Sequence, residues 1–466
     1  MSDVPFLQAG LHRQGVSRSM GLKLLVVCIL ALVMTIPALF VSGLVDDRTQ
    51  RAADVTKEIS EHVGGQQTFL GPTVAIPYTI PAQTKDESTQ RGIYLVFPAQ
   101  ASASARTATE ERHRSLFKVP VFQADMQLDS VFDLSGVPAV LPPGATLNWD
   151  GAEVVVGVSD ARGALADATL TKDGQAVTLA PAIIAQSLMI GAPPGQQIKL
   201  ALFGAKVDGL SMAGTKFSVS SRLKFSGAER LSVLAYGKST RVAMQGDWAS
   251  PGFDGGFLPV SRTIANDGFQ AQWSVPFIAR GVRAEGPIDA FVGLDATAMA
   301  VSFVEVADPY QSVNRALKYV ALFIGLVFLS YFVFEVTTGR PVHIAQYVLV
   351  GIAQLIFYLL LLAIAERVGF DFGFLVAGGA TVALLSLNAA WVFESRAQGF
   401  RALGCFSLLY TLIYSLLRLE DNAMLAGALV SFAAVAAAMY VTRGIDWYAS
   451  LEGKMGAGTQ TPGSTA

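Results

Sequence analysis

The sequence predicts a membrane protein with one N-terminal transmembrane helix, a large β-rich extracytoplasmic domain and a five-helix transmembrane bundle at its C-terminal end. Three observations predict this fold class. Long apolar runs occur once near the N-terminus and then repeatedly between residues 317 and 441. The stretch between them has no such run and carries most of the charge. Hydrophobic residues make up 52% of the chain and charged residues 15%, against about 25% charged residues in soluble proteins.

The first apolar run, residues 22–45, is long enough to cross a bilayer, which takes about 20 residues of helix. It has a positive flank at Arg13, Arg18 and Lys23, but it is longer than the apolar core of a cleaved signal peptide, about 7–15 residues. No good small-x-small cleavage site follows it. We therefore predict an uncleaved transmembrane anchor, preceded by a cytoplasmic segment at residues 1–21.

The later apolar runs, within residues 317–441, predict a bundle of five spans. They lie at residues 317–336, 344–365, 372–393, 402–417 and 423–441. With the anchor this makes six spans, so both termini are expected on one side. Cytoplasmic loops are enriched in Lys and Arg. Because Arg340, Arg396, Arg401 and Arg443 fall on the side of the N-terminus, both termini are predicted to be cytoplasmic. The tail, residues 442–466, is therefore predicted to be cytoplasmic. Its Gly/Thr/Ser-rich end, residues 453–466, is expected to be disordered.

Residues 46–316 are predicted to form the extracytoplasmic domain, mainly of β structure. Short runs of β-branched, aromatic and alternating apolar residues are separated by Gly, Pro and Asp clusters, which is typical of strands in a sandwich or barrel. The expected strands are residues 74–80, 93–97, 119–122, 154–158, 198–203 and 217–225. A helix at residues 52–62 is expected to continue from the anchor.

Composition excludes several classes of partner and cofactor. The net charge of −2, without a basic block, gives no indication of nucleic-acid binding. The two cysteines, Cys28 and Cys405, lie within apolar runs, so the domain has neither a disulfide framework nor a thiolate metal site. Four scattered histidines do not suggest a metal cluster. No metal, cofactor-binding or catalytic residue is therefore predicted.

One short motif could suggest an enzyme. Ser221 and Lys224 have the S-x-x-K spacing of Ser/Lys acylating enzymes. That chemistry usually places the pair on a turn of helix, whereas this pair lies in the alternating run at residues 217–225. An ordinary exposed strand face is the simpler interpretation. The protein is predicted not to be an enzyme.

Polar residues in the bundle are candidate functional residues, because burying an ionisable group near a bilayer costs free energy. A short Gly/Pro-containing turn separates Glu335 from His343, so the two helices must be antiparallel neighbours there. Gln346 lies on the same helix face as His343. We predict that Glu335, His343 and Gln346 form one polar cluster; the alternative is that each faces headgroup water independently. Gln354 and Asn388 are expected to make hydrogen bonds between helices.

The bundle closely resembles the C-terminal half of the bacterial inner membrane protein CreD family. The matching pieces of the bundle are residues 315–319, 334–335, 343–347, 357–361, 419–423 and 439–448. In the β-rich domain they are Gly71-Pro72, residues 91–94, 159–163 and 247–248, and Phe257-Leu258-Pro259. Gln90 and Asn422 depart from the family's usual pattern. The resemblance covers nearly the whole chain after the anchor.

The resemblance implies a non-catalytic protein of the bacterial inner membrane that contributes to cell-envelope integrity. Family members belong to the regulon of the CreBC two-component system and affect colicin tolerance and β-lactam responses. The implied partners are the lipid bilayer and a periplasmic or envelope protein bound by the β domain. The alternative is a transporter or channel that uses the bundle, although residues 317–441 show no internal repeat. A membrane-anchored hydrolase is the third hypothesis.

Overall fold

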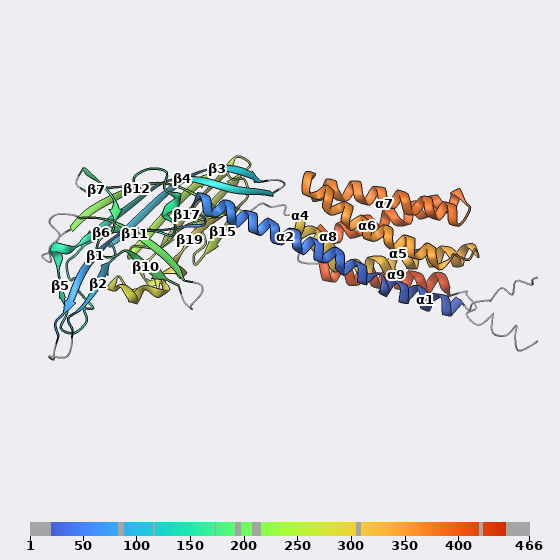
Figure 1. Cartoon of the computed structure of the whole chain (residues 1–466), viewed down its shortest axis with the longest axis horizontal. Helices are drawn as coiled ribbons and strands as arrows, with labels where there is room; N and C mark the ends of the chain where they lie inside the picture. The colour runs from blue at the N-terminus through green and yellow to red at the C-terminus, as the bar shows by residue number, and fades with distance from the viewer. Residues whose placement is uncertain are drawn as a thin grey trace, which may run out of the picture. The chain divides into compact units, whose positions relative to one another are not determined.

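A computed structural model describes residues 20–82, 88–114, 117–172, 174–191, 197–206, 216–303, 309–418 and 423–443. The chain divides after Gln50 and after Val306 into two units (Figure 1). The helical unit consists of residues up to Gln50 and from Ala307 onward, and the sheet unit is Arg51–Val306. Most of the expected cytoplasmic segment 1–21 and the tail from residue 444 lie outside the described residues.

The N-terminal anchor is helical throughout. Helix α1 (Met20–Val33) and helix α2 (Thr35–Val63) are separated at Met34, and together they provide one long apolar candidate span. Pro37 lies in the first turn of α2, where a missing backbone N–H does least harm. The predicted helix at residues 52–62 is the last part of α2.

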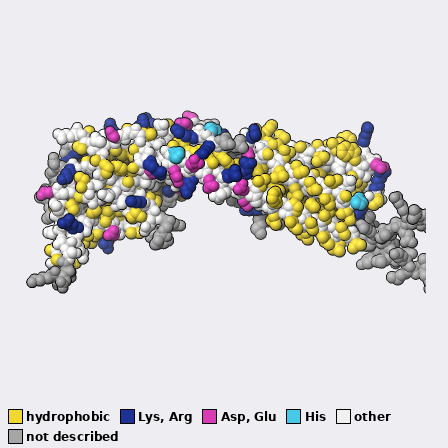
Figure 2. Space-filling model, viewed as in Figure 1, with side chains coloured by type: hydrophobic (Ala, Val, Ile, Leu, Met, Phe, Trp, Pro, Cys, Tyr) yellow, Lys and Arg dark blue, Asp and Glu magenta, His cyan; other side chains and the backbone are white. Residues whose placement is uncertain are grey.

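The rest of the helical unit consists of six further helices. They are α4 (Pro309–Lys318), α5 (Val320–Thr338), α6 (Ile344–Val368), α7 (Phe370–Val392), α8 (Arg396–Arg418) and α9 (Ala423–Thr442). Figure 2 shows hydrophobic side chains over the visible face of this unit, as a lipid-facing surface requires. In the sheet unit, Lys, Arg, Asp and Glu are scattered among the other side chains.

Four of the C-terminal helices, α5 to α8, are long and apolar enough to cross a membrane in the part of the chain that the structure describes. The sequence predicted five such spans. The fifth, residues 423–441, coincides with α9, but α9 is not among the helices that are long and apolar enough to cross within the described residues. The first of the five also begins later than predicted, because Tyr319 separates α4 from α5.

Tight turns and small residues pack these helices closely. Gly339 ends α5 in the left-handed conformation, with φ of 66°, and its N–H donates to the carbonyl of Glu335 at 3.0 Å. Between α6 and α7, a Cβ on Gly373 would lie 3.0 Å from the backbone nitrogen of Ala365. Gly351 of α6 similarly accommodates Met34 of the anchor. Small residues at such contacts let helices approach one another in a membrane.

The sheet unit contains two β-sheets. The eleven-stranded sheet comprises β1 (Gln67–Ile80), β2 (Gln90–Val96), β5 (Thr146–Leu147), β6 (Glu153–Val158), β9 (Ala180–Pro181), β10 (Ser187–Ile190), β11 (Ile198–Lys206), β13 (Arg230–Val233), β15 (Pro251–Gly255), β18 (Glu285–Pro287) and β19 (Met299–Phe303). Its main strand order is β10-β11-β6-β1-β13-β19-β15.

The eight-stranded sheet has the order β16-β17-β14-β3-β4-β12-β7-β8. Its strands are β3 (Gln100–Arg114), β4 (Phe117–Asp133), β7 (Thr169–Lys172), β8 (Gln175–Thr178), β12 (Lys216–Ala228), β14 (Ser239–Gly246), β16 (Ser261–Ala265) and β17 (Gly268–Val275). Short helices connect strands at α3 (Phe277–Arg280), η1 (Trp149–Gly151), η2 (Ala161–Gly163) and η3 (Ile288–Thr297). Each of the six strands predicted from the sequence overlaps an observed strand.

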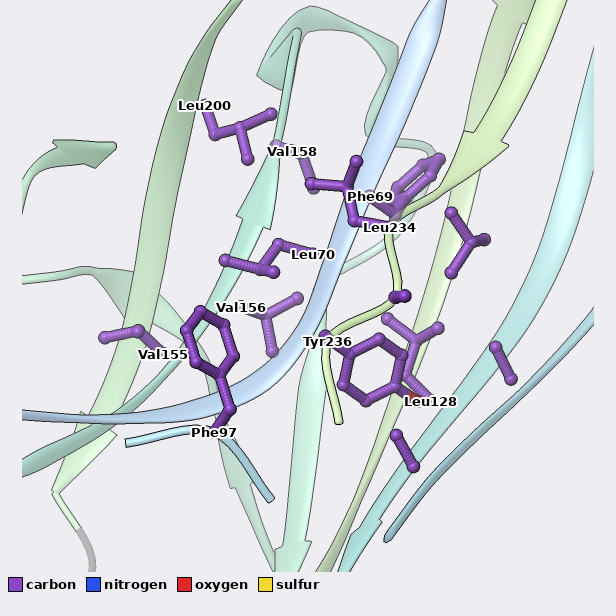
Figure 3. Close-up of a cluster of buried hydrophobic side chains, with 14 of the residues drawn as sticks. Phe69, Leu70, Phe97, Leu128, Val155, Val156, Val158, Leu200, Leu234 and Tyr236 are labelled. Atoms are coloured by element: carbon purple, nitrogen blue, oxygen red, sulfur yellow. The ribbon is translucent and has the colours of Figure 1, made fainter. Parts of the chain in front are cut away.

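One hydrophobic core contains side chains from both sheets (Figure 3). Phe69 of β1 meets Phe225 of β12 edge to face, with ring centroids 5.3 Å apart. The buried Tyr236 hydroxyl donates to the carbonyl of Ser102 at 2.6 Å, and burial raises its pKa well above the ordinary tyrosine value. Its ring lies against Gly71, where a Cβ would come within 2.3 Å. The domain is therefore a two-layer β structure with a shared core.

The end of α2 is fixed to the sheets by a polar junction. Gly64 and Gly65 both have positive φ, at 94° and 59°, and form the turn from α2 to β1. The side-chain amide of Gln67 donates to the carbonyl oxygens of Gly64 at 2.8 Å and Asp160 at 3.0 Å. A Cβ on Gly64 would lie 2.6 Å from the Cα of Gly163. The η2 loop thus packs directly on this turn.

Candidate functional site

The outward face of the eight-stranded sheet carries a polar hollow of about 450 Å³. Five strands line it, namely β12, β4, β3, β14 and β17. Two small residues, Ser104 of β3 and Ala243 of β14, pair across neighbouring strands at its centre. Because successive side chains of a strand alternate between faces, the residues beside them in register form the walls. We call this feature the sheet hollow.

Two cross-strand rows form the sheet hollow. Strand register aligns the first row as Arg222, Gln127, Ser104, Ala243 and Gln272. It aligns the second as Lys224, Asp125, Arg106, Gln245 and Gln270, of which all but Lys224 line the hollow. Long polar side chains therefore surround a floor of small ones.

Several side chains of the sheet hollow have no partner within the described part of the protein. Arg222, Gln270 and Gln272 make neither a hydrogen bond nor an ion pair there. Arg106 is held more firmly. With the Gln245 amide oriented so that its oxygen faces the guanidinium, that oxygen accepts from Arg106 Nε at 2.8 Å. The hollow thus presents two arginines and several amides to solvent, with Asp125 as its carboxylate.

A second hollow, of about 400 Å³, adjoins the first and shares Arg106, Gln245 and Gln270 with it. Asp247 and Asp267 line its far part. The two hollows together form a groove that changes from basic near Arg222 to acidic near Asp267.

The Ser221/Lys224 pair cannot act as an S-x-x-K dyad. Residues three apart on a strand point to opposite faces. Ser221 faces the core with 0% exposure, and Lys224 faces solvent. The expectation of an exposed strand face is therefore right for Lys224 and wrong for Ser221. Among the described residues, no group of three or more His, Cys, Asp or Glu side chains could hold a metal ion.

Glu335 is the centre of a buried polar cluster in the helical unit, at 1% exposure. Lys23 of α1 makes an ion pair with it and also donates to the carbonyl of Val342 at 2.7 Å. The Tyr347 hydroxyl donates to the Glu335 carboxylate at 3.0 Å, and the Val342 N–H donates at 3.1 Å. We call Lys23, Glu335, Val342 and Tyr347 the Glu335 cluster. It ties the N-terminal anchor to the turn between α5 and α6.

His343 and Gln346, which the sequence grouped with Glu335, have other partners. His343 caps the start of α6, where its Nδ1 accepts from the N–H of Ala345 at 3.2 Å. The Gln346 carbonyl oxygen accepts from the Asn388 amide at 3.2 Å. No hydrogen bond within the described residues joins either of them to Glu335.

The two amides expected between helices behave differently. Asn388 of α7 links three helices, because it donates to Gln346 of α6 and accepts from the Tyr331 hydroxyl of α5 at 3.1 Å. That prediction is confirmed. Gln354 of α6 is fully buried, and neither its amide nitrogen nor its oxygen has a partner in the described part of the chain. For Gln354 the prediction is wrong.

Sequence reasoning missed both Lys23 and the sheet hollow. Lys23 was interpreted only as a flanking charge of the anchor, and nothing local indicates a partner more than 300 residues away. The residues of the sheet hollow come from five strands, so only the strand register brings them together. An indirect signal existed in β3, where small and polar residues alternate over Gln100–Arg114.

These features define a multi-pass membrane protein that carries a large two-sheet domain between its first and second apolar spans. A family model described as "Inner membrane protein CreD" matches residues 19–448. A relative, the inner membrane protein CreD of Escherichia coli strain K12, is 32% identical over 438 residues, which cover 90% of this chain and 91% of the relative. The chain belongs to the CreD family of inner membrane proteins.

Two of the family motifs contain a glycine at a tight contact. In the Arg91–Tyr94 motif, a Cβ on Gly92 would lie 2.3 Å from the ring of Tyr78. In the Ser159–Gly163 motif, a Cβ on Gly163 would lie 2.4 Å from the carbonyl oxygen of Ser226. At Gly92 and Gly163 these two motifs therefore have a packing role. The motif residues at 419–422 and 444–448 lie outside the described residues.

Proposed function

We propose that this protein is a non-catalytic inner-membrane protein that supports cell-envelope integrity by binding a periplasmic or envelope component through its sheet unit. The sheet hollow is the observation that carries the proposal. It collects on one solvent-facing surface the side chains of Arg222, Gln270 and Gln272, which have no partner among the described residues. Polar groups that are free and held on a rigid sheet can bind a ligand without rearrangement. Membership of the CreD family supports the inner-membrane setting, and the resemblance implies a part in colicin tolerance and β-lactam response under CreBC control.

The proposed orientation places both termini in the cytoplasm and the sheet unit in the periplasm. The excess of Arg on the N-terminal side supports it, and it requires α9 to complete a fifth C-terminal crossing. Fusions to a reporter that is active only outside the cytoplasm should be active at Gly157 and inactive after Tyr448. An active fusion after Tyr448 would contradict this orientation.

The binding role is tested by complementation of a strain that lacks the gene. Arg222→Glu and Arg106→Glu reverse charges in the sheet hollow and should fail to restore colicin and β-lactam responses. Arg241→Glu is the matched control, because Arg241 also faces outward from β14 but does not line the hollow. All three proteins must accumulate to the wild-type level. Full complementation by both hollow variants would contradict the proposal.

A second candidate function is transport through the bundle, and Gln354 is the observation that favours it. A buried amide without a partner in the middle of α6 is the kind of group that binds a passing solute or water. Against it, the Glu335 carboxylate is already fully engaged. Purified protein in proteoliposomes should show no proton or potassium flux above empty vesicles. Flux that is abolished by Gln354→Met would favour transport.

A further inference from the structure

We infer that the sheet hollow binds an extended acidic peptide segment, with its carboxylates directed toward Arg222 and Arg106. This inference rests on the proposed function and specifies the chemistry of its ligand. It derives from the dimensions of the hollow, its charges, and the kinds of polar group that line it.

The dimensions fit a short extended chain. The hollow extends over β12, β4, β3, β14 and β17, which are four strand-to-strand steps. At about 4.8 Å per step, its long direction is about 19 Å. An extended peptide rises by about 3.3 Å per residue, so about six residues cover this length. Ser104 and Ala243 leave the centre low enough for a chain to lie across the strands.

The charges favour carboxylates. Arg222 and Arg106 line the hollow together with the single carboxylate of Asp125. A guanidinium binds a carboxylate with two parallel hydrogen bonds, and Arg222 has no competing partner within the described residues. Asp247 and Asp267 line the neighbouring hollow, so a bound chain has a preferred direction, with its acidic groups toward Arg222.

The uncharged groups favour a peptide over a sugar chain. Gln270 and Gln272 each carry a carboxamide without a partner in the described part of the chain, and a carboxamide donates and accepts in the same way as a peptide group. A chain of alternating N–H and C=O groups can pair with such side chains along its length. Among the described residues no aromatic side chain lines the hollow, so a sugar ring would find no apolar platform on them.

Binding is measured with the full-length protein in lipid nanodiscs and a fluorescein-labelled hexapeptide of alternating Ala and Glu. The matched peptide replaces every Glu with Gln. Arg222→Gln and Arg106→Gln should each weaken binding of the Glu peptide about tenfold, because each removes one charge-assisted contact. Arg222→Lys should retain part of the affinity. Asp125→Asn should tighten binding by about twofold to fivefold, since it removes a like charge.

Arg241→Gln is the control and should leave the affinity unchanged, since Arg241 does not line the hollow. Equal binding of the Glu and Gln peptides, or an equal loss in Arg241→Gln and Arg222→Gln, would overturn the inference. So would binding of isolated cell-wall sacculi without binding of the Glu peptide.

A photo-crosslinking residue at position 243, with a control at 239 on the same strand face, separates this inference from the proposed function. Adducts in growing cells that form only at Ala243 show that the hollow is occupied, whatever the ligand. Such adducts without Glu-peptide binding would overturn the acidic-peptide inference alone. The absence of adducts at Ala243 would overturn both.

Discussion

The Glu335 cluster and the sheet hollow are both rich in polar side chains, but they differ in whether those side chains have hydrogen-bond partners within the described part of the protein. Glu335 is buried, and its carboxylate receives hydrogen bonds from Lys23, Tyr347 and the backbone of Val342. In the sheet hollow, Arg222 and Gln272 face solvent and have no partner among the described residues.

The difference follows from the surroundings of each site. Within a bilayer no water is available, so an unpaired charge near the hydrocarbon costs several kcal/mol and must find a partner inside the protein. On a sheet face, water satisfies the same groups at little cost and leaves them available for a ligand. Full pairing therefore indicates a structural role for the Glu335 cluster, and free groups indicate a binding role for the hollow.

The largest expected effect comes from breaking the Glu335 cluster. Glu335→Ala leaves the partly buried Lys23 without a counter-charge and the cluster without its acceptor, and it should destabilise the helical unit by about 3–5 kcal/mol. Denaturant unfolding in bicelles measures the loss, and Glu394→Ala is the matched control, because its ion pair with Arg340 is exposed. An equally small effect of the two substitutions would mean that the Glu335 ion pair contributes no more to stability than an exposed one.

A double-mutant cycle then tests which partners belong to the cluster. The predicted clasp requires energetic coupling between Glu335 and His343, whereas the observed contacts require coupling between Glu335 and Lys23. We expect the Lys23/Glu335 coupling to be the larger of the two. Strictly additive losses for Glu335→Ala and His343→Ala would mean that His343 is not part of a clasp.

Arg280 tests whether a buried charged group in the sheet unit also depends on hydrogen-bond partners inside the protein. Its guanidinium is buried and lies 4.2 Å from the ring centroid of Phe97. Nε donates to the carbonyl of Ala235 at 2.7 Å and Nη1 to that of Arg283 at 3.0 Å, whereas Nη2 has no partner in the described part of the chain. Burial lowers the pKa of Arg280 to about 10, so it stays protonated at neutral pH. Arg280→Ala should destabilise the sheet unit by about 2–4 kcal/mol, because two carbonyls lose a charged donor.

Thermal unfolding followed by tryptophan fluorescence measures this loss. The exposed Arg241→Ala is the control for removal of a positive charge. Arg280→Met keeps a long apolar side chain at this position but removes the guanidinium, so it tests whether the hydrogen bonds are required. If it unfolds like the wild type, apolar packing alone holds this site, and the requirement for hydrogen bonds is refuted.

The sequence was sufficient for the features that depend on local composition. A crossing needs a long apolar run, and such runs are visible without a fold. Strand β3 was missed because Ala, its most frequent residue, is depleted in strands. Its buried Ala101, Ala103 and Ala105 face the core only because β4 and β14 pair with it on both sides.

The sites depended on contacts between distant residues. The sequence correctly marked Glu335 as unusual, since a carboxylate near the membrane needs a partner, but it selected partners close in the chain. The observed ion pair joins Glu335 to Lys23 in the anchor. For the sheet hollow, Arg222 and Gln272 meet only through the register of five strands, which is not readable from local pattern.

Substitution of Gln354 should change the stability of the helical unit in the opposite direction to substitution of Glu335. Its buried amide makes no hydrogen bond in the described part of the chain, so its burial costs free energy. Gln354→Met keeps the shape and removes the unpaired polar atoms. We expect the helical unit to become more stable by about 1 kcal/mol in bicelle unfolding. Asn388→Leu, which removes paired groups, should instead destabilise it. A loss of stability in Gln354→Met would mean that the amide has a bound partner.

Asp160 gives a smaller, pH-dependent effect at the surface of the sheet unit. Hydrogen bonds from Arg162 lower the pKa of this carboxyl below its ordinary value. Because the folded-state pKa is depressed, the contribution to stability is present above the unfolded pKa of about 3.9 and is lost as pH falls through the folded value. Asp160→Asn should flatten the acid side of the stability profile below about pH 5. An unchanged slope would show that the ion pair contributes nothing in solution.

The smallest effects are expected for substitutions of Ser221 and Lys224. These residues match the S-x-x-K spacing but do not form a catalytic pair. The Ser221 hydroxyl is buried without a described partner, so Ser221→Ala removes an unsatisfied group and should leave stability equal or slightly higher. Lys224 faces solvent and makes no described ion pair, so Lys224→Ala should change stability by less than about 0.5 kcal/mol. Both variants should complement the envelope phenotype fully, because the strand places the two side chains on opposite faces, where no proton can pass between them. Loss of complementation at normal protein levels would instead give the pair a chemical role and reopen the enzyme hypothesis.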